Sequence, residues 1–129
     1  DLSSARQLDL APTGHAARGT SSPPGPTASN LYMEAGKVSP EELMSDICEG
    51  LYVTEVMGSG LNLVTGDYSR GAGGFLIKNG ELSHPVSEIT IAGNITDMFG
   101  NLSAADDLEF LHGFDAPTLR IDGMTVAGS

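Results

Sequence analysis

Tryptophan is absent from this 129-residue chain, and cysteine occurs once, as Cys48. A single cysteine excludes a disulfide within the chain, which is consistent with a reducing compartment such as the cytoplasm. No run approaches the roughly 18 to 20 apolar residues of a membrane-spanning helix. The first residues also lack the basic start of a signal peptide, and the chain does not begin with methionine. We therefore expect part of a larger cytoplasmic protein, without a membrane segment.

Basic residues are scarce as well. Six lysines and arginines stand against 17 acidic residues, which gives a formal net charge of -11. The electrostatic field of this negative charge repels the phosphates of nucleic acids and the headgroups of anionic lipids. The composition thus argues against binding to nucleic acid or to a membrane.

The first 29 residues have almost no large apolar side chains after residue 10. Within residues 11–29, every position except His15 and Arg18 is Ala, Pro, Thr, Gly or Ser. A segment of this composition cannot bury enough apolar surface to offset the entropy lost on ordering. The sequence predicts a mobile, linker-like segment over residues 1–29 and a folded domain over residues 30–129. A loop that covers a substrate is the alternative for the first segment.

Two helices are predicted by their capping residues. Ser39 can cap a helix that Pro40 begins, and Glu42 can complete a capping box, which predicts a main helix over about residues 40–49 that ends at Gly50. Cys48 is expected on the inner side of this helix, as a small core residue. Asn94 can cap a second, short helix over about residues 95–101.

Most of the remaining chain has the two-residue period of strands. Asn79-Gly80 predicts a type I′ turn and therefore a tight hairpin. Strands are expected over residues 30–33, 51–57, 74–78, 86–91, 108–111 and 118–126. The last one is expected to be either interrupted by a turn or kinked by a bulge at Asp122-Gly123. The predicted fold class is α+β and dominated by β structure, with an antiparallel sheet that forms a partly closed barrel or a sandwich.

Residues for catalysis or metal binding do not fall into a known pattern. The three histidines, His15, His84 and His112, are far apart and in different predicted elements, so none is expected to bind a metal ion. A nucleophilic triad could be assembled only by free choice among common residues, and no Gly-x-Ser-x-Gly motif is present. We therefore predict no catalytic residue and no cofactor in this chain.

One segment is chemically unusual. Residues 63–74 place an acid, a phenol, a hydroxyl and a cation among glycines, as Asp67, Tyr68, Ser69 and Arg70. Glycines let a backbone approach a ligand closely, and a guanidinium can bind a carboxylate in bidentate fashion. These four residues are the candidate site for a peptide or an interface. The alternative is a β-turn with a surface ion pair between Arg70 and Asp67.

Ordered stretches of this sequence resemble a known family. The stretches are Gly50–Glu55, Leu63–Ala72 and Ser87–Asn94. They resemble the carboxy-terminal region of the TldD/PmbA family, in particular its PmbA branch, also called TldE and modulator of DNA gyrase. The resemblance extends from about Asn30 to Gly128.

The resemblance implies a function in cytoplasmic peptide breakdown or maturation. In this family a TldD-like subunit carries zinc, and the PmbA-like subunit pairs with it and lacks the metal. Between Asp107 and Pro117 the sequence has no cysteine-bearing glycine loop of the TldD type. The resemblance thus implies a non-catalytic subunit that binds a TldD-like partner and an unfolded peptide, with zinc only in the partner.

Two other functions stay open at this point. The chain could be a structural module that forms a homodimer through exposed β surfaces, with the glycine motif serving only to turn the chain. It could also be an independent hydrolase, which the missing catalytic pattern disfavours most.

Overall fold

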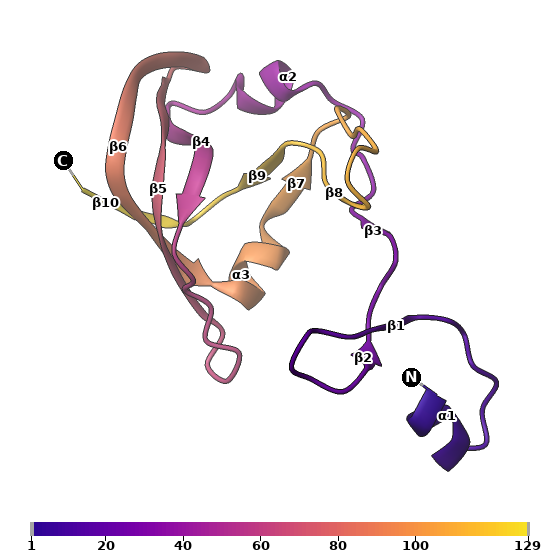
Figure 1. The fold of residues 1–129 in the computed structure, drawn as a ribbon. Helices are drawn as coiled ribbons and strands as arrows, with labels where there is room; N and C mark the ends of the chain where they lie inside the picture. Colours follow the sequence, from indigo (N-terminus) through magenta and orange to yellow (C-terminus); the bar gives the residue numbers. More distant parts are fainter. Residues whose placement is uncertain (1, 129) are drawn as a thin grey trace. The chain divides into compact units, whose positions relative to one another are not determined.

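The structure, a computed structural model, describes residues 2–128 and divides into two compact units (Figure 1). The first unit contains the residues up to 33 together with residues 110–115. The second contains residues 34–109 and the residues from 116 onward. The prediction of a linker-like segment over residues 1–29 stays a prediction, and we describe each unit by itself.

The first unit consists of short elements. They are α1 (Leu2–Gln7), β1 (Ala16–Ala17), β2 (Gly25–Pro26), β3 (Leu31–Tyr32) and β8 (Phe114–Asp115). β1 pairs with β2 in antiparallel orientation, whereas β3 and β8 are parallel. The strand expected at residues 30–33 is therefore present as β3.

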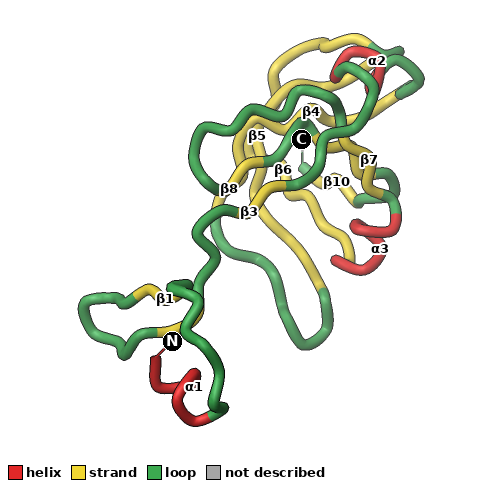
Figure 2. The backbone as a smooth tube through the Cα atoms, turned by 90° about the vertical axis from the view of Figure 1, so that its right-hand side faces the viewer, coloured by secondary structure: helices red, strands yellow, loops and turns green. Residues whose placement is uncertain are grey.

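The second unit is built on a four-stranded antiparallel sheet with the order β10-β6-β5-β4. Its strands are β4 (Glu49–Met57), β5 (Asp67–Lys78), β6 (Glu81–Asn94) and β10 (Thr125–Ala127). Strands dominate this unit, and its helices are short (Figure 2). The sheet is open, with β4 and β10 at its edges, so the α+β antiparallel class is confirmed but the sheets do not close into a barrel.

The hairpin between β5 and β6 forms as predicted. Asn79 and Gly80 both have positive φ angles, 51° and 79°, which a type I′ turn requires. Lys78 and Glu81 face each other directly across the turn. Local turn chemistry was therefore sufficient to predict this feature.

The main helix is correct at its start and wrong at its end. α2 comprises Pro40–Met44, and the Ser39 hydroxyl accepts a hydrogen bond of 3.1 Å from the Glu42 amide. The helix does not continue to residue 49, because the amides of Ser45 and Ile47 donate to the carbonyls three residues back, those of Glu42 and Met44, and the chain enters β4 at Glu49. Gly50 lies inside β4 and does not end the helix, and Cys48 is exposed, not a core residue.

The second helix is confirmed. α3 comprises Ile95–Gly100, and the side-chain oxygen of Asn94 accepts a hydrogen bond of 3.1 Å from the Thr96 amide. It leads into β7 (Leu102–Ala104), which pairs with β9 (Leu119–Ile121) in a separate antiparallel ribbon.

The strand predicted at residues 108–111 is wrong. The Asp115 carboxylate accepts hydrogen bonds from the amides of Leu111, His112 and Gly113, at 3.2, 3.0 and 3.0 Å. This turn occupies the amides that a strand would use for pairing. The expected interruption at Asp122-Gly123 is present, because Gly123 has a φ of 82° and separates β9 from β10.

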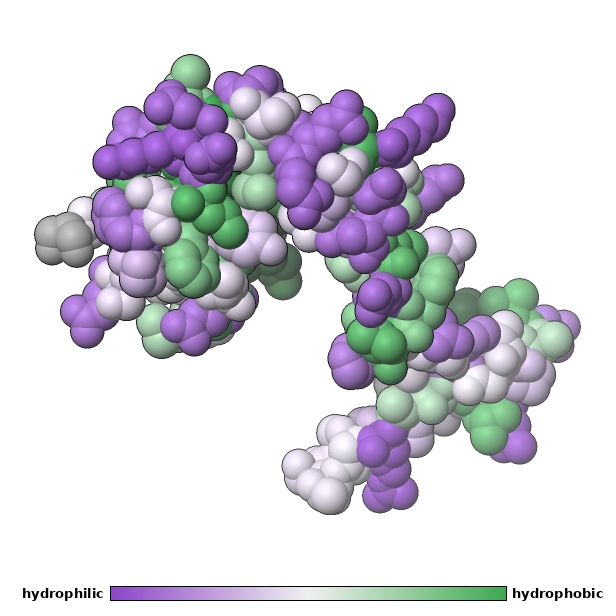
Figure 3. Space-filling view, turned by 90° about the horizontal axis from the view of Figure 1, so that it is seen from above, coloured by the Kyte–Doolittle hydropathy of each residue, from purple (hydrophilic) through white to green (hydrophobic). Residues whose placement is uncertain are grey.

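The core of the second unit is small. Its buried apolar side chains are Ala72, Ile77, Ile89, Ile91, Met98 and Ala105. They come mainly from β5, β6 and α3, so packing is concentrated on one face of the sheet. Apolar residues also show at the surface between hydrophilic ones in both units (Figure 3).

Candidate functional site

The unusual segment around residue 67 is a strand for most of its length. Thr65 and Gly66 form the end of a turn, and β5 then runs without a break through the glycines from Asp67 to Lys78. The alternative of a β-turn at Asp67 and Arg70 is thus wrong, and the strand expected at residues 74–78 begins earlier, at Asp67. Glycine-rich composition concealed a strand that pairs on both sides, with β4 and with β6.

The strand divides the four candidate side chains between two faces. Successive residues of a strand point to opposite faces, and burial follows this alternation: Asp67 and Ser69 are exposed, whereas Tyr68 and Arg70 are partly buried. The structure therefore places the four residues in one segment but does not bring all four side chains together. Any shared ligand would contact the acid and the cation from different sides.

The two exposed residues, Asp67 and Ser69, border a shallow hollow of about 370 Å³. Its lining residues are Ser59, Gly60, Leu61, Asn62, Asp67 and Ser69. The carboxylate of Asp67 accepts a hydrogen bond of 2.7 Å from the Thr65 hydroxyl, which fixes its orientation. On this face, Asp67 therefore stabilises the turn that directly precedes β5.

The inner face meets a larger cavity of about 480 Å³. Tyr68 lines it together with apolar side chains of α2, α3, β4 and β9, among them Leu43, Met98 and Leu119, and with Ile47 from the segment between α2 and β4. A concave, mainly apolar space with few polar groups is typical of a ligand or docking pocket. Arg70 does not line this cavity, although it lies on the same face of β5.

Arg70 has no ionic partner among the described residues. The ion pairs within residues 2–128 both involve Arg120, and the Nε atom of Arg70 is buried without a hydrogen-bond partner. The surface pair with Asp67 that we considered does not form, since the Asp67 carboxylate lies on the other face and binds Thr65. A buried donor without an acceptor costs free energy. The side chain as a whole is only partly buried, so the accessible part of the guanidinium can bind a carboxylate supplied from elsewhere.

Gly60 permits the position of Arg70. A Cβ atom at residue 60 would lie 1.6 Å from the carbonyl oxygen of Ser69 and 3.2 Å from Cγ of Arg70. Only glycine lets the two chain segments approach this closely, and the Ser69 amide donates a hydrogen bond of 2.8 Å to the Gly60 carbonyl.

No pattern in the sequence indicated a second cationic centre, which the structure places at Arg120. Its guanidinium binds the carboxylates of Asp46 and Asp122 and donates a hydrogen bond of 2.9 Å to the Leu43 carbonyl. The hydrogen bond from Arg120 lowers the pKa of Asp46, and the two carboxylates raise the pKa of Arg120. Arg120 lines the larger cavity, where its charge is already neutralised.

The described residues do not fit a zinc site. Within residues 2–128, no three His, Cys, Asp or Glu side chains are close enough to hold a metal ion together. His15, His84 and His112 are all exposed and lie in separate parts of the chain. None of the described helices is long and apolar enough to cross a membrane.

Comparison with known proteins assigns the family. Residues 1–128 match the PmbA/TldA metallopeptidase C-terminal domain. The chain is 40% identical over 126 residues to metalloprotease PmbA of Escherichia coli O157:H7, which covers 97% of this chain and 26% of that protein. It is 49% identical over 88 residues to the PmbA homolog of Haemophilus influenzae, covering 67% of this chain and 20% of the homolog.

A solved structure agrees with this assignment. A Thermotoga maritima protein described as a modulator of a DNA gyrase superposes with a TM-score of 0.74 at 32% identity, over 98% of this chain and 29% of its own. The chain thus spans about a quarter of the length of the relatives that it matches. On the family match and these identities, the chain belongs to the PmbA/TldA metallopeptidase family, in the region of its C-terminal domain.

Proposed function

We propose that this chain is the C-terminal domain of a PmbA-like subunit that acts in cytoplasmic peptide breakdown or maturation. The subunit pairs with a TldD-like subunit that carries the zinc ion, and this domain contributes binding surface and no metal ligand. In this division of labour the TldD-like partner performs the chemistry.

The observation that carries the proposal is the unpartnered cation of the motif. Arg70 lies on the inner face of β5 with a buried Nε atom that has no acceptor. A peptide offers carboxylates at its C-terminus and on acidic side chains, and a guanidinium binds such groups with charge-assisted hydrogen bonds. In the proposed function, Arg70 holds a carboxylate of the peptide or of the partner subunit.

The sheet edge supports peptide binding as well. β4 pairs with β5 from Glu49 to Met57, and no strand pairs with the other side of β4 among the described residues. An open edge can accept an extended peptide as an additional strand, because its free N–H and C=O groups need partners. The acidic residues Glu49 and Glu55 lie on this edge strand, which favours a peptide with basic side chains.

Replacement of Arg70 tests the proposal. The full-length protein is mixed with the TldD-like subunit, and peptide cleavage is measured for wild type, Arg70→Ala and Arg70→Lys. We expect Arg70→Ala to lower kcat/KM or weaken the complex by about tenfold or more, as for the loss of a hydrogen bond to a charged group. Arg70→Lys should recover part of the loss, since it keeps the charge but not the bidentate geometry.

Lys78→Ala is the matched control. Lys78 is an exposed cation at the end of the same strand, so its removal changes the net charge equally without touching the motif. If Arg70→Ala leaves both kcat/KM and complex formation at the level of Lys78→Ala, Arg70 has no such function. Zinc analysis of the separate subunits completes the test, and stoichiometric zinc in the PmbA-like subunit alone would contradict the division of labour.

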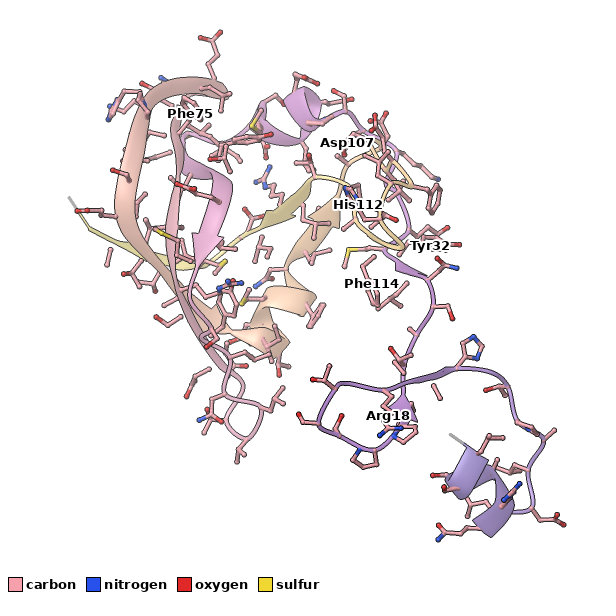
Figure 4. All side chains as sticks on the ribbon, in the orientation of Figure 1. Arg18, Tyr32, Phe75, Asp107, His112 and Phe114 are labelled. Atoms are coloured by element: carbon pink, nitrogen blue, oxygen red, sulfur yellow. The ribbon has the colours of Figure 1, made fainter. Side chains whose placement is uncertain are left out.

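A second candidate, a homodimerising module, is favoured by the first unit. Five large apolar side chains of its β3 and β8 region are 58–68% exposed: Leu31, Tyr32, Phe110, Leu111 and Phe114. The rings of Tyr32 and Phe110 form a T-shaped contact with centroids 5.1 Å apart, and Figure 4 labels Tyr32 and Phe114 in this unit. At about 200 Å² for each large side chain, the exposed part amounts to roughly 600 Å².

This area approaches the roughly 800 Å² that each partner buries in a standard interface. Light scattering of the full-length protein, alone and with the TldD-like subunit, separates the two functions. A homodimer that persists in the presence of the partner and is lost in Phe114→Asp would favour the second candidate.

A further inference from the structure

The loop between β4 and β5 exposes two apolar side chains almost completely. Leu63 is 88% and Val64 is 94% exposed, whereas the next most exposed large apolar residues that the structure describes, Phe110 and Leu111, reach 68%. In Figure 1 this loop projects beyond the end of the sheet, near α3. We refer to residues 62–66 as the tip loop.

The tip loop is held in one conformation by its own hydrogen bonds. The Asn62 side-chain oxygen accepts from the amides of Val64 and Thr65, at 2.9 and 3.3 Å. The Gly66 amide donates to the Asn62 carbonyl, and the Asn62 amide donates to the Asp67 carbonyl, both at 2.8 Å. These contacts close the loop on itself while the side chains of residues 63 and 64 stay outside.

A second set of hydrogen bonds fastens the loop to α3. The Asn94 side chain donates to the Thr65 carbonyl at 3.1 Å, and the Ile95 amide donates to the Gly66 carbonyl at 2.8 Å. Gly66 has a φ of 80°, and a Cβ atom there would lie 3.0 Å from Nδ2 of Asn94. The same asparagine that caps the helix therefore also fixes the loop.

This arrangement does not bury the two apolar side chains. Ordering a loop costs conformational entropy, and neither Leu63 nor Val64 gains burial in return within the described chain. A rigid loop that presents apolar side chains is preorganised for binding, because a partner then meets them without a further ordering cost.

Charge indicates the nature of that partner. The exposed charged residues next to the tip loop are acidic: Asp67 follows it, and Asp97 lies in the first turn of α3. The chain as a whole carries a formal charge of -11. An anionic membrane would repel this surface, whereas a protein socket with an apolar floor and a basic rim would complement it.

We propose that Leu63 and Val64 form a knob that inserts into an apolar, basically rimmed socket of the partner subunit and so anchors the subunit interface. This inference rests on the proposed pairing with a TldD-like subunit, and it assigns a docking element to that pairing. Each side chain is expected to contribute a factor of about 10 to 100 to the affinity, the range for burying one Leu or Val.

The experiment measures the Kd between the full-length protein and the TldD-like subunit by calorimetric titration. The variants are Leu63→Asn, Val64→Thr and the double variant, and Leu82→Asn is the control because Leu82 is a half-exposed leucine of the same unit, on β6. We expect each tip variant to weaken binding at least about tenfold, the double variant most, and the control to bind as wild type does. The melting temperatures should stay at the wild-type value, since both replaced side chains are exposed.

The outcomes separate this inference from the proposed function. If the wild-type protein forms the complex and the double variant binds with the same Kd, the docking function of Leu63 and Val64 is overturned and the subunit pairing is not. No complex with the wild-type protein overturns both. An unchanged Kd with lowered kcat/KM also overturns docking, since the tip would then act on the peptide. A Kd that does not rise as the salt concentration is raised would contradict the basic rim.

Discussion

Asp107 accepts two hydrogen bonds from Thr118, one of 2.8 Å from its amide and one of 2.6 Å from its hydroxyl. Asp107 lies shortly after the end of β7, and Thr118 lies directly before the start of β9. Because β7 and β9 pair with each other, the contact closes the base of the excursion between them. This aspartate acts together with the 2.9 Å hydrogen bond from the Ala105 amide to the Thr118 carbonyl, which closes the same end of the ribbon of β7 and β9.

The first prediction concerns the pH dependence of this pair. The hydroxyl of Thr118, followed by its amide, lowers the pKa of Asp107 below the ordinary 3.8. A carboxyl group whose pKa is lowered by folding contributes stability that is present above its unfolded pKa and is lost as the pH falls through its folded pKa. Thr118→Val removes only the hydroxyl, so we expect a loss of about 1 kcal/mol at neutral pH.

Urea unfolding of the purified protein at a series of pH values, from about pH 7 down to about pH 2, provides the measurement. The difference in unfolding free energy between wild type and Thr118→Val should shrink as the pH falls below 3.8 and through the lowered pKa of Asp107, where the carboxylate takes up a proton. Thr125→Val, at an exposed position of β10, is the control. A difference that stays constant with pH would show that the hydroxyl does not act through the ionised carboxylate.

The second prediction concerns Arg120. Its side chain is 22% exposed and joins Asp46, Asp122 and the Leu43 carbonyl, so it ties β9 to the end of α2. Arg120→Met should destabilise the protein by about 1–2 kcal/mol, because the carbonyl loses its donor while the apolar stem is retained. Asp46→Asn should have a smaller effect, since the Asp46 side chain is 71% exposed and solvent screens its charge.

Thermal unfolding of the two variants checks this order. A higher salt concentration should reduce the difference in melting temperature between wild type and Asp46→Asn more than the difference between wild type and Arg120→Met. The reason is that salt screens the exposed ion pair. An equal loss in both variants would mean that the ion pair, and not the hydrogen bond to Leu43, is the main contribution.

Local chemistry determined which elements could be predicted. Ser39, Asn94 and Asn79-Gly80 act within a few residues of themselves, through side-chain hydrogen bonds to neighbouring amides or through positive φ angles, so their effects are visible in the sequence. The end of α2 was not predictable, because residues 47–49 bind the distant hairpin instead, through hydrogen bonds to the amides of residues 79–80 and through strand pairing with Lys78. Tertiary contacts of this kind override helical propensity.

The candidate site was located in the sequence but its arrangement was not. The three glycines among residues 71–74 hid the first part of β5, because glycine weakens a strand, so the alternation that separates Tyr68 and Arg70 from Asp67 was not visible in the sequence. Arg120 and Asp46 form an ion pair although they are separated by 74 positions in the sequence, and no local pattern indicates such a contact. Long-range pairing of side chains is a property of the folded chain.

The third prediction concerns Glu88, a strained position in β6. Its φ is 58°, in the left-handed region that costs a non-glycine residue about 1–2 kcal/mol. The pairing shifts here, from Ala72 opposite Ile89 to Gly74 opposite Val86, which identifies a bulge. Glu88→Gly should therefore stabilise the protein by about 0.5–1 kcal/mol, after the greater entropy of glycine in the unfolded chain is subtracted.

Glu81→Gly is the control for this substitution. Glu81 begins the same strand without a positive φ, so glycine should destabilise the protein there by about 0.5–1 kcal/mol. Urea unfolding of both variants shows directly whether each substitution raises or lowers the free energy of unfolding. If Glu88→Gly also destabilises, the side chain of Glu88 makes a contact that outweighs the backbone strain.

The last prediction concerns the close approach of β4 and β5. A Cβ atom at Gly74 would lie 1.9 Å from the carbonyl oxygen of Tyr52 and 3.1 Å from the Thr54 amide nitrogen. These are backbone atoms at the bulge of the edge strand, so no side chain can move aside to make room. Gly74→Ala should therefore destabilise the protein by about 2–3 kcal/mol, the range for forced overpacking.

Gly100→Ala is the matched control, because no heavy atom lies within 4 Å of a Cβ atom built there. That variant should be neutral or slightly more stable, since alanine favours a helical conformation over glycine. Hydrogen exchange of the β4 amides in Gly74→Ala locates the effect: loss of protection confined to β4 means that the edge strand separates from β5. Because the proposed peptide would add to this edge, the same variant should lose peptide binding, and retention of binding would place the peptide elsewhere.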